Sequence, residues 1–233
     1  MISLRGWVIC TVGLLAIEFA FAELSIAPVE CPKPFCLCYK KSRGRAVCSG
    51  RSLHYIPRLP KYVRSVTFTN TSISVIHKFG LVNLTFHQLE RINFTGNLLL
   101  SIDKDAFLNL TFLDTLIISF EPRLTTHSLK SSFRSLPRLK ILIFDFSFNF
   151  WKSLPKDMFN NYHLSNVKFL FLQGNSFSNV NFTTFGTMTR LQGISLANNK
   201  ISHISLTKLN ALTKLDMSSN LLPKVPTFCE RDN

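Results

Sequence analysis

Apolar residues recur along the chain in one repeated frame. Its first, fourth and sixth positions are apolar in all seven copies, which start at Val63, Leu89, Leu113, Leu139, Val167, Leu191 and Leu212. The starts are separated by 26, 24, 26, 28, 24 and 21 residues. At the chain's apolar content of 46%, chance would fill every position on the order of once in ten million trials. The pattern predicts a repeat array in which each copy has a short strand with its apolar residues facing inward.

A polar position follows each of these strands. Eight residues after the starts stand Thr71, Asn97, Glu121, Ser147, Asn175, Asn199 and Asn220, so four of the seven are asparagine. The chain must turn away here and leave backbone donors and acceptors in the interior, where each unpaired group costs about 1–3 kcal/mol. An asparagine amide can both donate and accept, so it satisfies neighbouring turns.

The tail of each repeat is expected to close a convex side. Its apolar positions are Ile73, Leu99, Phe177, Ile201 and Leu222, followed by Ile76, Ile102, Val180, Ile204 and Val225. Repeats three and four break this tail, because Glu121-Pro122-Arg123 and the run from Phe144 to Trp151 do not fit the turn. We expect an irregular coil or an insertion there, for which functional specialisation and simple drift are both open explanations.

The N-terminus has the features of a secretory signal. Residues 1–22 combine Arg5, an apolar stretch from Gly6 to Ile17 and the small-residue pattern Ala20-Phe21-Ala22. Glu18 interrupts the apolar part, and an N-terminal membrane anchor is the alternative, although the run is short for a bilayer. We therefore expect a soluble, extracellular mature chain that starts near Glu23.

Four cysteines cluster after this segment. Cys31, Cys36, Cys38 and Cys48 predict two disulfides in an oxidising compartment, while a four-thiolate zinc site is the competing interpretation and fits the spacing less well. Cys229 has no obvious partner. It is expected either to pair with a second chain or to be the first cysteine of a C-terminal cap.

Together these motifs resemble extracellular leucine-rich repeat proteins. The cluster Cys31-Pro32 to Cys48, followed by Leu53, Ile56-Pro57 and Leu59-Pro60, is similar to their cysteine-rich N-terminal cap. The resemblance implies an α/β fold, a parallel β horseshoe of seven repeats, with cap disulfides Cys31–Cys38 and Cys36–Cys48. The expected organisation is a signal peptide at 1–22, the cap at 23–62, leucine-rich repeats at 63–228 and a tail at 229–233.

Within this family, the phenylalanine-rich repeats are most similar to Toll-like receptor ectodomains. A downstream phenylalanine recurs in Asp105-Ala106-Phe107 and Asp157-Met158-Phe159. The resemblance implies innate-immune recognition of a microbial or protein ligand, by the N-terminal part of such an ectodomain or by a truncated relative. The alternative is a secreted matrix protein that binds collagen, growth factors or glycosaminoglycan.

Charge is unevenly distributed along the sequence. The formal net charge is +14, and the segment from Cys31 to Leu89 has ten basic residues and no Asp or Glu. Lys40, Lys41, Arg43 and Arg45 form a tight cluster inside the cap. We expect this cluster to bind heparan sulphate or another polyanion, with a merely solvated loop as the alternative.

The sequence offers no catalytic or metal-binding motif. Its six histidines are scattered without a ligand spacing, and hydrolase, phosphate-loop and dinucleotide fingerprints are lacking. We predict a protein that is not an enzyme and that has no metal and no cofactor.

The expected ligand-binding surface is the concave face. Its central positions, between the buried fourth and sixth, are Thr67, Asn93, Ile117, Ile143, Phe171, Ser195 and Asp216. The predicted site is an apolar patch of Ile117, Phe120, Ile143, Phe146, Phe169 and Phe171, with Ile141 beside it. Alternatively, the irregular tails fold back over these residues and make them core.

Two further surface features follow from the sequence. Glycosylation sequons occur at Asn70, Asn83, Asn93, Asn109 and Asn181, and those at Asn70 and Asn93 fall in strand segments, where glycans would obstruct a ligand. The apolar edges at Leu212, Leu215 and Met217 have no terminal cap in the sequence, so we expect self-association through that end.

Overall fold

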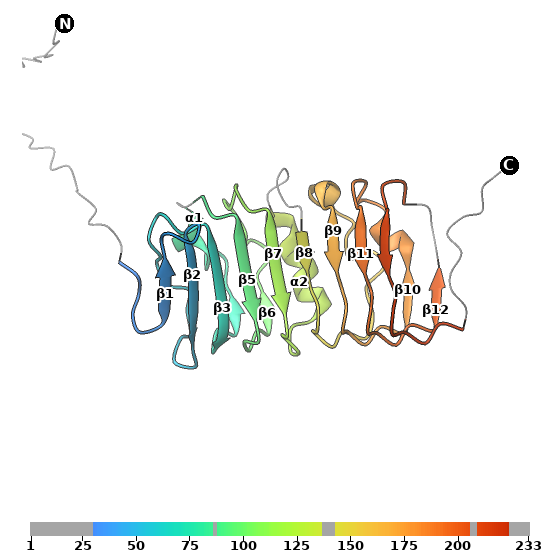
Figure 1. The fold of residues 1–233 in the computed structure, drawn as a ribbon, viewed down its shortest axis with the longest axis horizontal. Helices are drawn as coiled ribbons and strands as arrows, with labels where there is room; N and C mark the ends of the chain where they lie inside the picture. Colours follow the sequence, from blue (N-terminus) through green and yellow to red (C-terminus); the bar gives the residue numbers. More distant parts are fainter. Residues whose placement is uncertain (1–29, 86–87, 137–142, 206–208, 224–233) are drawn as a thin grey trace, which may run out of the picture.

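A nine-stranded sheet runs the length of the molecule (Figure 1). The structure is a computed structural model and describes residues 30–85, 88–136, 143–205 and 209–223. The strands, in spatial order, are β1 (Cys36–Tyr39), β2 (Arg45–Gly50), β3 (Ser65–Thr71), β5 (Arg91–Thr95), β7 (Thr115–Ser119), β8 (Ile143–Asp145), β9 (Phe169–Phe171), β11 (Gly193–Ser195) and β13 (Lys214–Asp216). From β2 onward every neighbouring pair is parallel.

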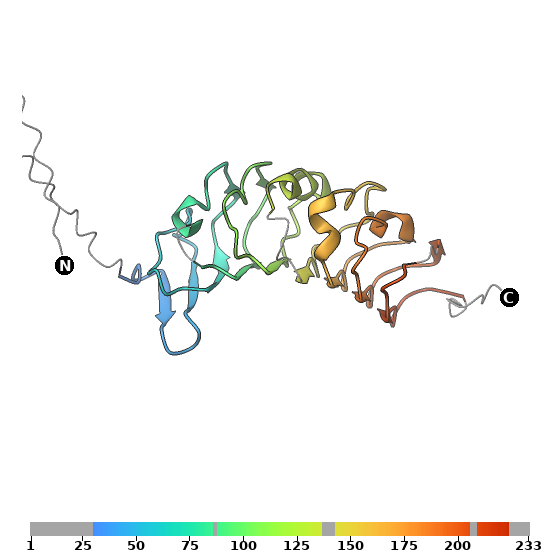
Figure 2. The same ribbon diagram turned by 90° about the horizontal axis from the view of Figure 1, so that it is seen from above.

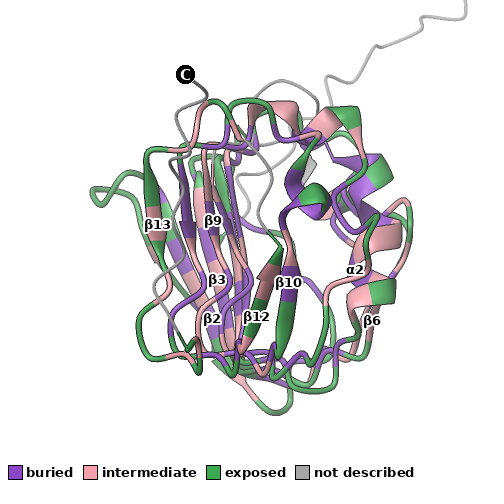
Figure 3. Ribbon diagram, turned by 90° about the vertical axis from the view of Figure 1, so that its right-hand side faces the viewer, coloured by how far each residue is buried: buried purple, intermediate pink, exposed green. Residues whose placement is uncertain are grey.

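The opposite side of the solenoid is built from short, varied segments (Figures 2 and 3). They are α1 (Val82–Thr85), α2 (Thr126–Ser132), the 3-10 helices η1 (Phe133–Ser135), η2 (Tyr162–Asn166) and η3 (Phe182–Phe185), and the two-stranded sheets β4 (Val75–Ile76) with β6 (Ser101–Ile102) and β10 (Asn179–Asn181) with β12 (His203–Ser205). No helix in these ranges is long and apolar enough to cross a membrane.

The core lies between the sheet and these segments. Apolar residues at the fourth and sixth frame positions are buried in the first six repeats, and stacked rings connect successive coils. Phe133 is a centre of this stacking, with ring centroids 5.7, 6.0 and 5.9 Å from those of Phe144, Phe146 and Phe159. The expected parallel leucine-rich repeat solenoid is confirmed.

The cap closes the N-terminal edge of the sheet. Both expected disulfides, Cys31–Cys38 and Cys36–Cys48, are present. The hairpin of β1 and β2 is antiparallel and brings Cys36 opposite Cys48, so the second disulfide joins its two strands. The proposed signal peptide and Cys229 lie outside the described residues.

The frame predicted for the fourth repeat is wrong by two residues. Phe144 pairs with Leu116 on one side and with Leu170 on the other, which makes Phe144 the fourth position and buried Phe146 the sixth. The polar position is therefore Asn149 rather than Ser147. Side chains of a strand alternate, so a shift of two residues keeps the same faces, and apolar counting cannot detect it.

With this frame the fourth repeat is regular, and the irregularity belongs to the third. Trp151 is buried at the first convex apolar position, and its indole Nε1 donates to the carbonyl of Leu124 at 2.7 Å. The third coil contains α2, which Thr125 caps by accepting a hydrogen bond from the backbone of Ser128. The expectation that the run from Phe144 to Trp151 does not fit the turn is therefore wrong, because in the corrected frame this run forms a regular repeat.

The last described coil is less buried than the coil before it. Leu212, Leu215 and Met217 are partly exposed, whereas Leu191, Ile194 and Leu196 at the same frame positions are buried. The three residues through which self-association was predicted are thus accessible in the part of the chain that the structure describes. Self-association through them stays a prediction.

One backbone position is left-handed in every repeat. The residue before each polar position has a positive φ, and the set is Asn70, Gly96, Phe120, Phe148, Gly174, Asn198 and Ser219. Glycine and asparagine suit this conformation, but phenylalanine does not. The rings of Phe120 and Phe148 stack with centroids 4.6 Å apart, and a Cβ on Gly174 would lie 2.1 Å from the ring of Phe148.

This geometry predicts the effect of adding a methyl group at two glycines. The Cβ added by Gly96→Ala would have no atom within 4 Å, so only the φ of +65° should lower the free energy of unfolding, by about 1–2 kcal/mol. At Gly174 the φ is similar, +67°, but the added Cβ would also collide with Phe148. Gly174→Ala should therefore lower the free energy of unfolding by about 1–3 kcal/mol more than Gly96→Ala. Urea unfolding measures both changes.

A rescue variant tests the cause. In a Phe148→Ala background, Gly174→Ala should cost no more than Gly96→Ala costs in the wild type, because the colliding ring is gone. An equal loss for both single glycine variants would contradict the stacked arrangement.

Candidate functional site

The sheet face presents side chains in rows that cross the strands. Strand register aligns the central row as Thr67, Asn93, Ile117, Asp145, Phe171, Ser195 and Asp216. All of them are at least partly exposed. The row was predicted correctly except in the fourth repeat, where Asp145 takes the place assigned to Ile143.

Two further residues of the predicted patch need correction. Ile143 lies in the neighbouring row, paired with Thr115 and Phe169. Phe146 is fully buried in the core, so its assignment to the ligand-binding surface is wrong. Both errors come from the frame of the fourth repeat, and Ile141 lies outside the described residues.

A smaller apolar surface remains at the middle of the face. Ile117, Ile143, Phe169 and Phe171 are partly exposed on three adjacent strands, β7, β8 and β9. The ring of Phe169 leans over Gly193, where an added Cβ would lie 2.9 Å from it. After β7, the described residues 120–136 lead into α2 on the opposite side of the solenoid (Figure 3).

The fifth residue of the predicted patch lies at its border. Phe120 follows β7, is 47% exposed and stacks on Phe148. It therefore extends the apolar surface towards the ends of the strands. We call Ile117, Phe120, Ile143, Phe169 and Phe171 the apolar patch.

Asp145 introduces a carboxylate into the apolar patch. Its Oδ1 accepts hydrogen bonds from the backbone N–H and the hydroxyl of Ser147, at 3.1 and 2.5 Å. The backbone N–H of Phe148 donates to the carbonyl of Gln173, which places residues 147 and 173 side by side. The side-chain Oε1 of Gln173 is buried and accepts no hydrogen bond from any residue in the described part of the chain.

Asp145 and Gln173 are thus two acceptors next to an apolar surface. The sequence analysis missed Asp145 because the predicted frame of the fourth repeat put Ile143 in the central row and Asp145 in the row beside it. The asparagine at 149 was the signal that could have placed it.

Behind the face, polar side chains form a continuous ladder. The backbone N–H groups of Thr71 and Asn149 donate to Oδ1 of Asn97 and Asn175, each at 3.1 Å. Asn175 and Asn199 donate from Nδ2 to carbonyls of their own coil and of the coil before. The asparagine position therefore has the bonding that its chemistry predicted.

Glu121 continues this ladder with a carboxylate. It is completely buried, and its Oε1 accepts from the backbone N–H and the Nδ2 of Asn97, both at 2.8 Å. Its Oε2 accepts from the backbone N–H of Leu99 at 3.1 Å. Its own N–H donates to Asn149 Oδ1, so the ladder passes through the third coil without a break.

Burial acts on the charge of Glu121. Desolvation raises the pKa of its carboxyl group, and the hydrogen bonds from Asn97 and Leu99 oppose that rise without cancelling it. With the pKa raised in the folded state, this residue stabilises the fold most at low pH. That contribution is lost as the pH rises through the folded-state pKa.

We predict that Glu121→Gln changes the dependence of stability on pH. The amide nitrogen of glutamine would face the N–H of Leu99, so the variant should be about 1–3 kcal/mol less stable at pH 4. The difference should narrow towards pH 7.5, because only the wild type loses stability by ionisation at this site. Urea midpoints across this range measure both chains.

The exposed carboxylate of Glu90, paired with Arg64 at 2.9 Å, supplies the control. Glu90→Gln should cost less than about 1 kcal/mol at any pH in the range. A gap between wild type and Glu121→Gln that stays constant with pH would contradict the burial effect.

The other predicted sites are the basic cluster of the cap and the five glycosylation sequons. Lys40, Lys41, Arg43 and Arg45 are exposed at the hairpin between β1 and β2, which projects from the sheet side (Figure 2). Of the sequons, Asn93 is in the central row and Asn70 is exposed near the end of β3, as expected. Asn83 in α1 donates to the carbonyl of Ile56, Asn109 is exposed and Asn181 caps η3.

Comparison with known proteins agrees with this geometry. The leucine rich repeat family model matches residues 165–222. The fold of the chain is a leucine-rich repeat solenoid. Its solenoid resembles human 5T4 (Wnt-activated inhibitory factor 1, trophoblast glycoprotein), with a TM-score of 0.59, 20% identity and coverage of 82% of each chain.

A second solved structure has the same repeat fold. TLR13, in its complex with ssRNA13, matches with a TM-score of 0.58 and 19% identity over 69% of this chain. The match spans only 22% of the TLR13 chain. No curated protein sequence matches the chain. At these identities the two structures establish a shared fold.

Proposed function

We propose that this leucine-rich repeat protein is a secreted or ectodomain recognition module that binds a protein or microbial ligand on its concave face. The apolar patch carries the proposal, because partly exposed Phe169 and Phe171 lie together on a face that the solenoid leaves open. A few aromatic residues at the centre of such a surface supply most of the binding free energy.

The chemistry of the patch narrows the ligand. The partly exposed carboxylate of Asp145 would lose its hydration under a purely apolar ligand, and the buried Oε1 of Gln173 beside it already lacks a donor among the described residues. The fitting ligand has apolar groups around one positively charged donor, such as a lysine or arginine side chain of a protein.

The resemblance to Toll-like receptor ectodomains supports an innate-immune role. A likeness to TLR13, whose solved structure contains single-stranded RNA, favours pattern recognition by a Toll-like receptor ectodomain or a truncated relative. Secretion is favoured by the signal-like residues 1–22 and by the two cap disulfides.

A matrix function is the second candidate, and the basic hairpin favours it. Lys40, Lys41 and Arg43 are exposed on a loop whose ends Cys36–Cys48 holds together, and Arg45 starts the following strand. Four cations on one projecting loop match the repeating anionic groups of heparan sulphate.

The concave-face proposal predicts the behaviour of two variants. A panel of extracellular proteins, microbial polymers and single-stranded RNA is screened against the secreted chain, and every binder is measured again by surface plasmon resonance. The double variant Ile143→Ser with Phe171→Ser should abolish binding while secretion and disulfides stay intact. Asp145→Asn should weaken a protein ligand about ten-fold or more, through loss of a charged hydrogen bond.

Asp216→Asn is the matched control. Asp216 is in the same row and also accepts from the backbone and hydroxyl of a nearby serine, Ser218, but its strand β13 lies three strands from β8, the strand of Asp145. Its substitution should leave the affinity unchanged. Failed secretion of the double serine variant would show that Ile143 and Phe171 are structural.

The basic hairpin predicts retention on heparin. Changing Lys40, Lys41, Arg43 and Arg45 to serine should lower the salt concentration of elution markedly, because fewer counterions are released on binding. The control removes four exposed cations elsewhere, namely Lys104, Arg123, Lys152 and Lys200. Equal shifts for both variants would indicate attraction by net charge alone and would refute a specific hairpin site.

A further inference from the structure

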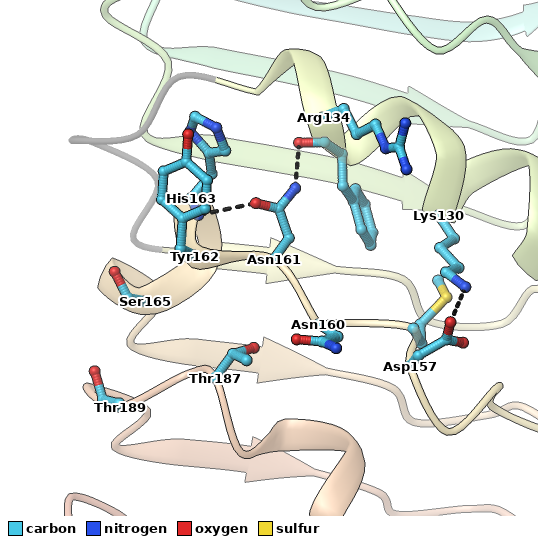
Figure 4. A pocket seen from close by; sticks show the side chains of 12 residues that line it. Lys130, Arg134, Asp157, Asn160, Asn161, Tyr162, His163, Ser165, Thr187 and Thr189 are labelled. Carbon is cyan, nitrogen blue, oxygen red and sulfur yellow. Dashed lines mark hydrogen bonds and ion pairs between the residues drawn. The ribbon is translucent and has the colours of Figure 1, made fainter.

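A cavity of about 750 Å³ opens on the convex side, opposite the sheet (Figure 4). Three successive coils line it: α2 and η1 in the third, residues 157–165 in the fourth, and Thr187 and Thr189 in the fifth. Phe133 and Met158 contribute buried apolar surface to its lining. Its volume is in the range of small-molecule sites, and neither the repeat frame nor the concave-face proposal uses it.

The walls of this cavity are fixed by contacts between coils. Asn161 bridges two of them, because its Nδ2 donates to the carbonyl of Phe133 at 3.1 Å and its Oδ1 accepts from the N–H of His163 at 3.0 Å. The hydroxyl of Thr187 donates to the carbonyl of Phe159, which joins the fourth and fifth coils. A cavity held in this way requires little ordering when a ligand binds.

The electrostatics of the cavity favour an anion. Among the described residues of the lining Asp157 is the one acid, and Lys130 Nζ lies 2.5 Å from its carboxylate. The hydrogen bond from Lys130 lowers the pKa of Asp157, so this pair stays ionised and mutually neutralised near pH 7. Arg134 is exposed and has no ion pair with any residue the structure describes, so its charge is available.

The uncharged polar residues of the cavity place a second requirement on the ligand. Asn160, Ser165 and Thr189 line the cavity. Their side chains form no hydrogen bond with any residue that the structure describes. At one end the ring of Tyr162 lies against that of His163, with centroids 4.1 Å apart, and is 62% exposed (Figure 4). Amide and hydroxyl groups beside an exposed aromatic ring suit a ligand with many hydroxyls and one apolar face.

We propose that this cavity binds a short acidic saccharide, with Arg134 pairing with its carboxylate or sulfate. The planar guanidinium can bind either anion through two parallel hydrogen bonds. Asn160 and the hydroxyls of Ser165 and Thr189 would bond to sugar hydroxyls, and the C–H face of the ring would lie on Tyr162. This site is independent of the concave face and of the basic hairpin.

Small probes test the site directly. The three probes are glucuronic acid, which has a carboxylate, glucose 6-sulfate, which has a sulfate, and glucose, which has neither. Ligand-observed NMR titration with the secreted chain measures the Kd of each. At least one acidic sugar should bind in the millimolar range, at least ten-fold tighter than glucose, and the better of the two identifies the anion. Equal affinity for glucose, or no detectable binding of either acid, would overturn the proposal.

Variants locate the binding. Arg134→Gln should weaken the acidic sugar at least ten-fold, Asn160→Ala should weaken both the acid and glucose, and Arg123→Gln, an exposed arginine of the same coil outside the cavity, should have no effect. Circular dichroism checks that each variant is folded. Unchanged binding by Arg134→Gln would refute the site.

Two controls separate this inference from other modes of binding. The serine variant of the basic hairpin should retain the acidic sugar in full, and its loss there would assign the sugar to the cap instead. Inorganic sulfate should bind more weakly than glucose 6-sulfate. Equal binding of the two would show that the saccharide ring makes no contact, which would refute saccharide recognition.

Discussion

The structure depends on satisfying the backbone where each coil turns out of the sheet. A strand of three to seven residues is followed at once by a turn whose N–H and C=O groups remain inside, and the ladder side chains bond to them. Each member after Thr71 accepts from the coil before it, as Asn97 does from Thr71 and Asn175 from Asn149. A turn is therefore completed by its successor, and this couples neighbouring coils beyond their apolar contacts.

Glu121 shows how much this position tolerates. A carboxylate has acceptors but no donor when ionised, yet three donors from the second coil converge on it. The fold thereby retains a buried acid, although desolvation disfavours its charge. The position selects for accepting oxygen atoms first and for an amide donor second, which explains why threonine, glutamate and asparagine all occur there.

The sequence was sufficient for the fold and for most of the concave row, since both depend on alternation along strands. It failed at the fourth repeat, because a two-residue shift preserves that alternation and only the ladder residue discriminates. Asn149, with Trp151 two residues later, is the better match to the repeat, but the apolar run around it fitted both frames. The cost of the wrong choice was local: Phe146 was assigned to the surface and Asp145 was overlooked.

The convex cavity is made by several coils and could not be predicted from the sequence. It belongs to repeats three to five, as the apolar patch does, and α2 contributes Lys130 to its lining. Strands stack about 4.8 Å apart, whereas a helix needs about 10 Å, so a helix in one coil forces the convex segments apart while the sheet stays continuous. The separation leaves space between α2 and the next coil, which is where the cavity lies. On the other side the sheet is continuous across these repeats, and Ile117 and Phe171 flank Asp145 in the central row.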